Sequence, residues 1–230
     1  MSIIVCGDLH GYNNLDVLRH DRLPLIPSYL IVAGDWGTIW NNSEHSIATE
    51  KRLLKWYNVQ PYITLVVLGN HEGYERISRL PQVKKFGNMV YQASPSVFIL
   101  QTGKIYLIDG KKIFVYGGAL SIDKNSRIPG VSWWAEEIPS YSQFKEAMAN
   151  LETNNELDYI ITHTAPVSIV KQMLADYGLV YRQDLQDETT LQLEEIKNKV
   201  TFKSWYFGHF HMDWGDGKFN CLYKKVALLT

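Results

Sequence analysis

The chain has 230 residues, of which 46% are apolar and 20% are charged, and its formal net charge is −1 at pH 7. This composition excludes a disordered chain, and it gives no overall field that would attract nucleic acid or a membrane surface. Cys6 and Cys221 are the only cysteines, so a disulfide framework is also excluded. The sequence shows neither a signal segment nor an apolar stretch of membrane-spanning length. We therefore expect a cytoplasmic protein with no membrane association and one domain over residues 1–230.

Five short apolar runs each lead directly to residue types that bind metals. Four runs stop at a glycine that is followed by such a residue, and the fifth leads to Thr162-His163. A continuous apolar run of this length is typical of a strand buried on both faces, and open α/β sheets bind ligands beyond the carboxyl ends of such strands. The pattern therefore predicts one crowded polar site. The runs are Ile3 to Cys6, Tyr29 to Ala33, Ile63 to Leu68, Tyr159 to Ile161 and Trp205 to Phe207.

The segments between these runs predict further elements. Apolar spacing over Glu50 to Tyr57 indicates a helix, and thus βαβ organisation. The turn dipeptides Thr102-Gly103 and Asp109-Gly110 separate three β-rich runs, for which we expect an antiparallel meander. Residues 117–139 show little periodicity, so we interpret them as a long loop and a candidate lid. The three β-rich runs are Val97 to Leu100, Lys104 to Ile108 and Lys112 to Tyr116.

Three helices are expected in the C-terminal half. Ser140 and Gln143 form a capping-box pattern before a helix to about Asn150. Pro166 suits the first turn of a helix over Val167 to Ala175. Thr189 or Thr190 is expected to cap a helix through Val200.

The spacing of the polar residues indicates a metal centre. Side chains two residues apart on an extended segment share a side, so Asp8 pairs with His10, and His209 pairs with His211. Carboxylate and amide oxygens mixed with imidazoles favour Mn, Fe, Ni or Zn over a Cys-rich structural zinc. Seven candidate ligands are too many for one tetrahedral ion, so we expect two divalent ions. The candidates are Asp8, His10, Asp35, Asn70, His163, His209 and His211.

In their order along the chain, these blocks resemble the calcineurin-like metallophosphoesterase superfamily, and in particular its bacterial and phage-type phosphoesterases. The resemblance spans nearly the whole chain, and it implies an α/β fold: a four-layer αββα sandwich of two mixed β-sheets flanked by helices. The blocks are Gly7-Asp8-Leu9-His10-Gly11, Gly34-Asp35, Gly69-Asn70-His71-Glu72, the lone His163 and Gly208-His209-Phe210-His211.

The resemblance also implies roles for the blocks. One metal would be held by Asp8, His10 and His211, and the other by Asn70, His163 and His209. Asp35 would bridge the two ions. His71 would lie beside the metals, where it would stabilise the transition state or protonate the leaving oxygen. Glu72 would orient His71 or the loop rather than touch substrate.

A pair of divalent ions suits phosphoester hydrolysis, because the ions neutralise phosphate charge and lower the pKa of a bound water, which becomes the nucleophile. We therefore expect a phosphomonoester or phosphodiester substrate of the nucleotide or nucleic-acid type, and manganese as the metal. Arg127 is a candidate phosphate clamp in the covering loop, and Trp133 and Trp134 are candidates for stacking a base or for anchoring that loop. Residues 117–139 and 176–187 are expected to shape specificity.

Two other functions stay open. In the protein-phosphatase branch the second block continues into Asp-Arg-Gly, whereas here it reads Gly34-Asp35-Trp36-Gly37. A serine/threonine-type protein phosphatase would then need another arginine, such as Arg127, to hold phosphate. A non-catalytic scaffold with this fold is the other alternative, which the complete ligand set disfavours. His20 and His45 lie outside every block, and we expect them to be ordinary surface residues.

Overall fold

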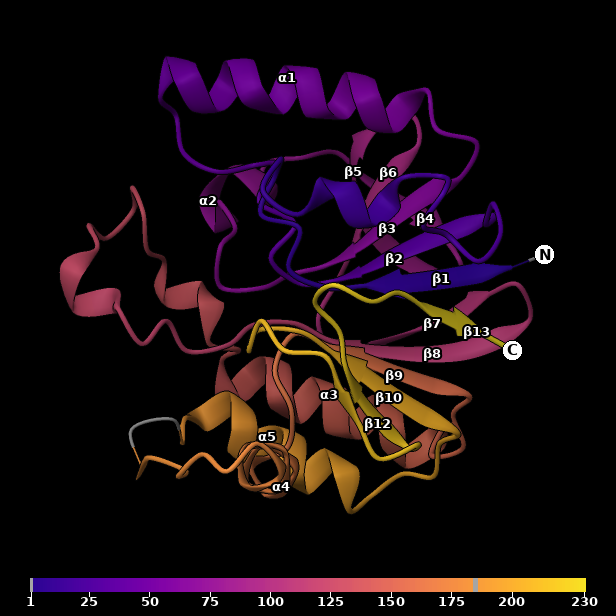
Figure 1. The fold of residues 1–230 in the computed structure, drawn as a ribbon, viewed down its shortest axis with the longest axis vertical. Helices are drawn as coiled ribbons and strands as arrows, with labels where there is room; N and C mark the ends of the chain where they lie inside the picture. The colour runs from indigo at the N-terminus through magenta and orange to yellow at the C-terminus, as the bar shows by residue number, and fades with distance from the viewer. Residues whose placement is uncertain (1, 184–185) are drawn as a thin grey trace.

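The computed structural model describes residues 2–183 and 186–230, and its strands form two mixed sheets (Figure 1). The first sheet contains, in spatial order, β13 (Ala227–Leu229), β1 (Ile3–Cys6), β2 (Tyr29–Ala33), β3 (Ile63–Val67), β6 (Val97–Leu100), β5 (Asn88–Ser94) and β4 (Gln82–Lys85). The second contains β11 (Trp214–Gly215), β12 (Phe219–Cys221), β10 (Ser204–Phe207), β9 (Tyr159–Thr162), β8 (Lys111–Tyr116) and β7 (Lys104–Ile108). Strands β1, β2, β3 and β6 run parallel, as do β8, β9, β10 and β12.

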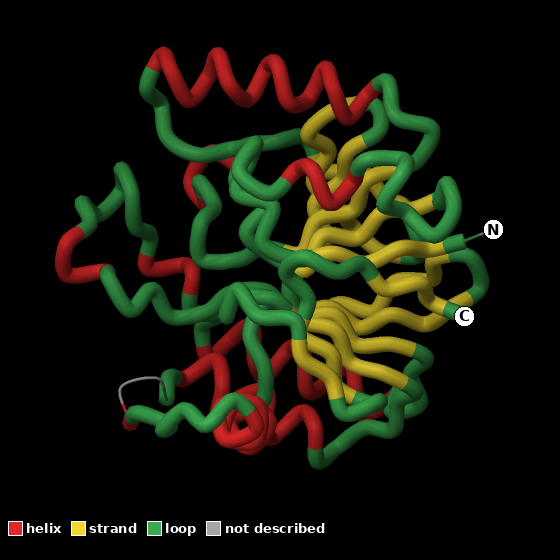
Figure 2. The backbone as a smooth tube through the Cα atoms, in the orientation of Figure 1, coloured by secondary structure: helices red, strands yellow, loops and turns green. Residues whose placement is uncertain are grey.

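Helices cover the outer face of each sheet, so the expected four-layer α/β sandwich is confirmed (Figures 1 and 2). The first sheet is covered by α1 (Glu44–Asn58) and α2 (Tyr74–Ile77). The second sheet is covered by α3 (Tyr141–Thr153), α4 (Val167–Asp176) and α5 (Glu188–Lys197). Short 3-10 turns are formed by η1 (Leu15–Leu18), η2 (Lys124–Ser126) and η3 (Ala135–Glu137).

Alternation along the strands divides the interior into three apolar clusters. In β1, Ile3 and Val5 point into the cluster between the sheets, whereas Ile4 and Cys6 point toward α1. The third cluster packs α3, α4 and α5 against the other face of the second sheet. Because these strands are buried on both faces, every residue of β1 is apolar and fully buried, as the continuous run predicted. The clusters hold the carboxyl ends of the central strands in fixed positions.

The predicted antiparallel meander is wrong. Strands β7 and β8 form the expected hairpin, but β6 belongs to the first sheet, where it lies between β3 and β5. The turn geometry explains the difference. Asp109 and Gly110 both have positive φ, at 51° and 74°, as a two-residue hairpin requires, whereas of Thr102 and Gly103 only Gly103 does. The chain at Thr102-Gly103 therefore crosses from one sheet to the other.

Helix boundaries also differ from the expectations. Helix α1 begins at Glu44, six residues before the predicted start, because Ser43 caps it by accepting a bond from the backbone N–H of Ser46. Helix α5 is capped by Asp187 rather than by Thr189 or Thr190. The capping box of Ser140 and Gln143 at the start of α3 is confirmed.

Residues 117–139 form a long covering segment whose regular structure is limited to η2 and η3. It extends from the end of β8 past the ends of the central strands, on the side where the polar loops gather (Figure 1). Of the other segment expected to shape specificity, residues 184 and 185 lie outside the described part of the chain.

Candidate metal centre

Five loops at one end of the two sheets carry the predicted ligands. The loops after β1, β2 and β3 come from the first sheet, and those after β9 and β10 come from the second. They bond to one another: the N–H of His10 donates to the Asp35 carbonyl at 2.8 Å, and that of Gly208 donates to the His163 carbonyl at 2.9 Å. All seven predicted ligands are thereby brought to one place, whereas His20 and His45 are exposed elsewhere.

The backbone at five of the seven ligands is left-handed. Asp8, His10, Asp35, His209 and His211 have φ between 47° and 72°. Asp8 and His10 do face one space, as expected, but the reason given for it is wrong: β1 ends at Cys6, and left-handed turns rather than an extended segment aim both side chains inward. Such a conformation costs a non-glycine residue about 1–2 kcal/mol and is concentrated at functional sites.

Gly34 allows the loops of the two sheets to meet. Its φ is +83°, and a Cβ there would lie 2.0 Å from Nδ1 of His163. No other residue type fits at this position, because a side chain would displace the imidazole. The His163 ring instead packs against the β2 loop, and its Nδ1 lies 3.0 Å from the carbonyl oxygen of Ala33.

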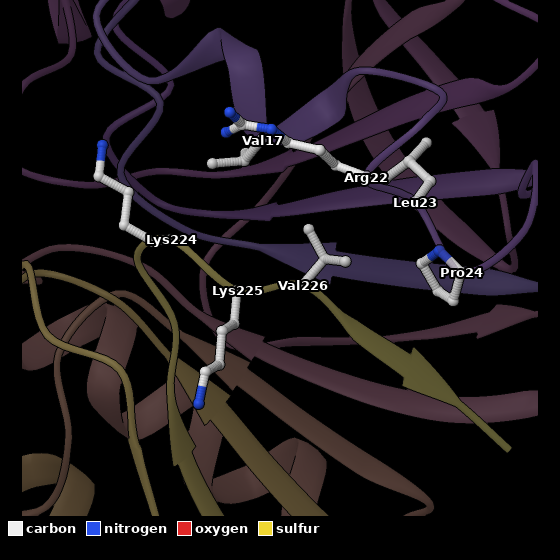
Figure 3. A pocket seen from close by; sticks show the side chains of 7 residues that line it. All are labelled: Val17, Arg22, Leu23, Pro24, Lys224, Lys225 and Val226. Atoms are coloured by element: carbon white, nitrogen blue, oxygen red, sulfur yellow. The ribbon is translucent and has the colours of Figure 1, made fainter.

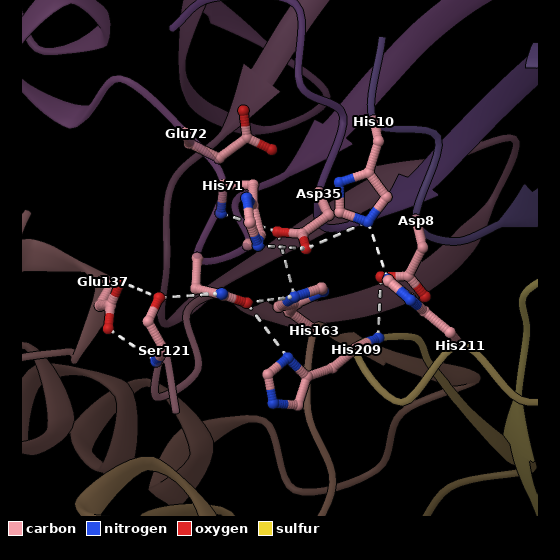
Figure 4. Close-up of polar contacts among 12 residues, drawn as sticks. Asp8, His10, Asp35, His71, Glu72, Ser121, Glu137, His163, His209 and His211 are labelled. Atoms are coloured by element: carbon pink, nitrogen blue, oxygen red, sulfur yellow. Dashed lines mark hydrogen bonds and ion pairs between the residues drawn. The ribbon is translucent and has the colours of Figure 1, made fainter. Parts of the chain in front are cut away.

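One group of ligand atoms gathers around His10 (Figure 4). Its Nε2 lies 2.8 Å from Nε2 of His211 and 3.6 Å from Oδ2 of Asp35. Asp8 joins them, and the four residues offer ligand atoms that all lie within 4.8 Å of one another. Asp8 Oδ2 is buried and has no hydrogen-bond partner among the described residues. An unpaired buried carboxylate oxygen is costly, and a bound cation would satisfy it.

A second group shares Asp35 with the first. Nε2 of His163 lies 3.2 Å from Asp35 Oδ1 and 3.0 Å from Oδ1 of Asn70. Nδ1 of His209 lies 3.1 Å from the same Asn70 oxygen. Because a carbonyl accepts only, Nδ1 of His163 carries a hydrogen for Ala33, and its Nε2 faces two oxygen atoms. A cation at this point would contact Nε2 of His163, Nδ1 of His209 and the oxygens of Asp35 and Asn70.

The charge state of the buried groups agrees with a cation site. Burial lowers the pKa of His10 to about 4 and that of His209 to about 3, so both rings are neutral at neutral pH. Burial alone would lower the pKa of His163 too, but the Asp35 carboxylate raises it to about 9. Burial raises the pKa of Asp8 to about 8. Protons on Asp8 and His163 thus supply positive charge that divalent ions would replace.

Two residues that the sequence did not reveal orient Asn70. Its Nδ2 donates to Oγ of Ser121 at 3.0 Å, and that hydroxyl donates to Oε2 of Glu137 at 2.8 Å (Figure 4). Oε1 of Glu137 accepts the N–H of Ser121 at 2.8 Å as well. Glu137 is fully buried although it belongs to the covering segment. These hydrogen bonds hold the Asn70 amide nitrogen away from the centre, so its Oδ1 faces His163 and His209.

His71 lies beside the two groups. Its backbone N–H donates to Oδ1 of Asp35 at 2.8 Å, and its Nε2 lies 3.9 Å from Oδ2 of the same carboxylate. Burial lowers the pKa of His71, and the nearby Arg127 lowers it further. Arg127 donates to Nε2 of His71 at 3.0 Å, since a guanidinium has no acceptor. Glu72 holds the β2 loop rather than His71: its Oε1 accepts the N–H of Trp36 at 2.7 Å.

The comparisons with known proteins assign the chain to a family. The sequence model described as calcineurin-like phosphoesterase matches residues 1–213. This chain is a calcineurin-like phosphoesterase by family. A lariat debranching enzyme from Schizosaccharomyces pombe (strain 972 / ATCC 24843) is 24% identical over 258 aligned positions, which cover 99% of this chain and 54% of that protein. The chain thus spans about half the length of this curated relative.

Among solved structures, this calcineurin-like phosphoesterase is similar to the phosphopantetheinyl hydrolase from Mycobacterium tuberculosis. The TM-score is 0.44 at 17% sequence identity, and the match covers 96% of this chain and 89% of the other. Within the residues described, no helix has the length and apolar character needed to cross a membrane.

A cavity of about 330 Å³ opens over the centre of this calcineurin-like phosphoesterase. Arg127 reaches into it from the covering segment, and its Nε forms an ion pair with Asp123 at 2.8 Å. Trp133 and Trp134 are not among the lining residues, and Trp134 is buried. The cavity is lined by Asp35, Asn70, His71, Leu120, Ile122, Asp123, Arg127, His209, Phe210 and His211.

A separate hollow of about 380 Å³ lies beside η1 and the start of β13 (Figure 3). Arg22, Lys224 and Lys225 give it a basic character, but Arg22 is paired with Asp16. Lys224 donates to Oδ1 of Asn14 at 2.7 Å and lies over the ring of Tyr223. That ring stacks on the ring of His211, with 4.8 Å between the centroids, so Lys224 and Tyr223 pack behind one of the candidate ligands.

Proposed function

We propose that this protein is a binuclear metal-dependent phosphoesterase that hydrolyses a phosphomonoester or phosphodiester of the nucleotide or nucleic-acid type. The observation that carries the proposal is the convergence of two ligand groups on the shared carboxylate of Asp35, beneath a cavity that His71 and Arg127 also line. The lariat debranching enzyme among the relatives supports the nucleic-acid type of substrate.

Seven residues would bind the two ions. Asp8, His10 and His211 would hold one ion, Asn70, His163 and His209 the other, and Asp35 both. Two divalent ions bound there would neutralise phosphate charge and ionise a water molecule. The donor set suits Mn, Fe, Ni or Zn, of which we propose manganese.

His71 and Arg127 would act on the phosphate group itself. The guanidinium can bind two phosphate oxygens at once, and its ion pair with Asp123 holds it over the cavity. Nε2 of His71 lines the same space and accepts from Arg127. When the guanidinium binds phosphate instead, a protonated Nε2 can stabilise the charge that develops on the phosphoryl oxygens or protonate the leaving oxygen. The indole of Trp40, which stacks on the His71 ring at 5.8 Å, restricts the movement of this base.

The proposal is tested by the loss of metal ligands. With manganese supplied, the wild-type protein should cleave at least one ester in a panel of phosphomonoesters and phosphodiesters. Asp35→Asn or His209→Ala should lower turnover by more than about 100-fold, because each removes a ligand that the proposed centre needs. Circular dichroism should show that the fold persists, and His45→Ala, an exposed histidine on α1, should retain full activity.

Two results would select the alternatives. Activity on phosphopeptides far above that on nucleotides would indicate a protein phosphatase, for which Arg127 is the phosphate-binding arginine that the geometry offers. A metal content near zero after gentle purification with ions supplied, together with no cleavage of any ester, would indicate a scaffold.

A further inference from the structure

Two cavities border the centre. The first is the cavity of about 330 Å³ that Arg127 enters, and the second is a hollow on the side of Trp40. It measures about 280 Å³ and meets the first cavity at His71, which lines both spaces. His10, a member of the first ligand group, lines it as well. No carboxylate is among its lining residues, so an anionic substrate would not be repelled there. The lining residues are His10, Asn13, Gly37, Trp40 and His71.

Trp40 presents a fixed aromatic surface to this hollow. Its indole lies nearly parallel to the ring of His71, with an interplanar angle of 19°. The buried indole of Trp134 forms a T-shaped pair with it, with 4.9 Å between the ring centroids. The backbone is held equally closely, because Gly73 donates to the carbonyl of Ile39 at 2.8 Å and a Cβ on Gly73 would lie 1.9 Å from the Trp40 oxygen. Such a surface loses little entropy when a planar ring stacks on it.

Two cavities on either side of His71 could hold the two organic substituents of one phosphate group. A phosphomonoester carries one organic substituent, whereas a phosphodiester carries two. The first cavity offers apolar contacts from Leu120, Ile122 and Phe210, and the second offers the indole of Trp40 and the amide of Asn13. The amide can both donate and accept hydrogen bonds, as the edge of a nucleobase requires.

We propose that Trp40 forms a subsite for a planar aromatic ring of the nucleobase class, carried on one substituent of a phosphodiester whose other substituent occupies the first cavity. This inference rests on the proposed function. In the reaction, the oxygen of water forms a bond to phosphorus and the bond from phosphorus to the leaving ester oxygen breaks. That oxygen keeps the electron pair and gains a proton, so a diester and water yield a monoester and an alcohol.

The test compares two diesters that share one leaving group. Thymidine 5′-(p-nitrophenyl) phosphate has a base for the subsite, and methyl p-nitrophenyl phosphate does not. The measured quantity is the ratio of kcat/KM for the thymidine ester to that for the methyl ester. We expect Trp40→Leu to lower this ratio about 5- to 100-fold, which is the range for loss of base stacking, and Trp40→Phe to restore part of it. Effects that act through His71 cancel in the ratio.

Binding supplies a second readout. Thymidine 5′-phosphate should quench tryptophan fluorescence in the wild-type protein and in Trp56→Leu, which makes the same change on α1. The quenching should be lost in Trp40→Leu.

Three results would overturn the inference. One is an unchanged ratio in Trp40→Leu, which would leave Trp40 as a support for His71 only. Another is quenching that persists in that variant. Cleavage of p-nitrophenyl phosphate without cleavage of either diester would also overturn it, while the proposed phosphoesterase function would stand. If the metal-loaded protein cleaves other esters of the panel but neither diester, only this inference fails, and if it cleaves no ester at all, both proposals fail.

Discussion

Asn70 is the one amide among the proposed ligands, and its orientation depends on Ser121 and Glu137. An amide can present either its oxygen or its nitrogen, and only the oxygen binds a metal. The hydroxyl of Ser121 donates to Glu137 and therefore accepts from the Asn70 nitrogen, which turns Oδ1 toward His163. The covering segment would thus take part in the proposed metal centre without contributing a ligand.

Ser121→Ala should weaken binding of the ion near Asn70 more than binding of the ion near Asp8. The reason is that loss of the hydroxyl frees the Asn70 amide to turn, and removal of such supporting groups typically lowers metal affinity about 10- to 100-fold. Titration calorimetry with Mn²⁺ would measure both affinities. Ser121→Thr keeps the hydroxyl and should recover most of the affinity.

The matched control is Ser126→Ala, because Ser126 lies in the same segment but its hydroxyl donates to the carbonyl of Asp123. Equal losses in Ser126→Ala and Ser121→Ala would contradict the assigned role. So would a loss at the Asp8 side alone.

At this scale, the sequence predicted the seven proposed ligands, because each follows a strand or a short turn motif that the pattern reveals. It did not predict Ser121, Glu137 or Trp40. Ser121 and Trp40 lie in irregular segments and Glu137 ends a short 3-10 turn, and in such segments no periodicity relates position along the chain to position in space. Glu136 and Glu137 are adjacent and look alike in sequence, yet Glu136 is exposed and Glu137 is buried.

Among the elements, the helices were easier to predict than the turns that connect strands. The Ser140 capping box is a local signal, and the helix it starts is present as α3. In contrast, Thr102-Gly103 and Asp109-Gly110 look alike in sequence, although only the second closes a hairpin. Strand β6 pairs with β3 because it is buried on both faces there, and such burial depends on the whole sheet rather than on a local turn signal.

The cap of α3 should contribute measurably to stability. Ser140→Ala removes the acceptor for the Gln143 N–H, and loss of such a cap typically costs about 1 kcal/mol. Urea denaturation should show this decrease in the free energy of unfolding. Because α3 packs on the outer face of the second sheet, activity of the folded protein should change little.

Ser142→Ala provides the comparison for that experiment. Ser142 is exposed in the same first turn, and alanine has the higher helix propensity, so stability should be unchanged or slightly increased. A loss in Ser142→Ala as large as in Ser140→Ala would show that the cap is not responsible.

For the whole molecule, the main feature is that the proposed ligands come from both sheets. Asp8, Asp35 and Asn70 follow strands of the first sheet, and His163 and His209 follow strands of the second. Ions bound between them would join the two halves of the sandwich. An ion that binds only the folded state stabilises it by about 2.7 kcal/mol at a concentration 100 times its Kd.

Manganese at about 100 times its Kd should therefore raise the Tm by roughly 5–10 °C for each bound ion over the value in a chelator, given a shift of about 2–4 °C per kcal/mol for a chain of this size. Differential scanning calorimetry would measure the change. Asp35→Asn should lose most of it, because Asp35 belongs to both ligand groups, whereas His45→Ala should keep it. A shift of the same size in Asp35→Asn would argue against a shared carboxylate.

The left-handed backbone at five proposed ligands restricts how the centre can be altered by mutation. Asparagine tolerates that conformation, so an Asp-to-Asn exchange at position 8 or 35 changes the charge while preserving the course of the chain. Alanine or a β-branched residue there would let the loop relax as well, so its effect would mix geometry with chemistry. Laboratory evolution of a new metal preference should accordingly select Asn, Asp, His and Gly at these five positions more often than other residue types.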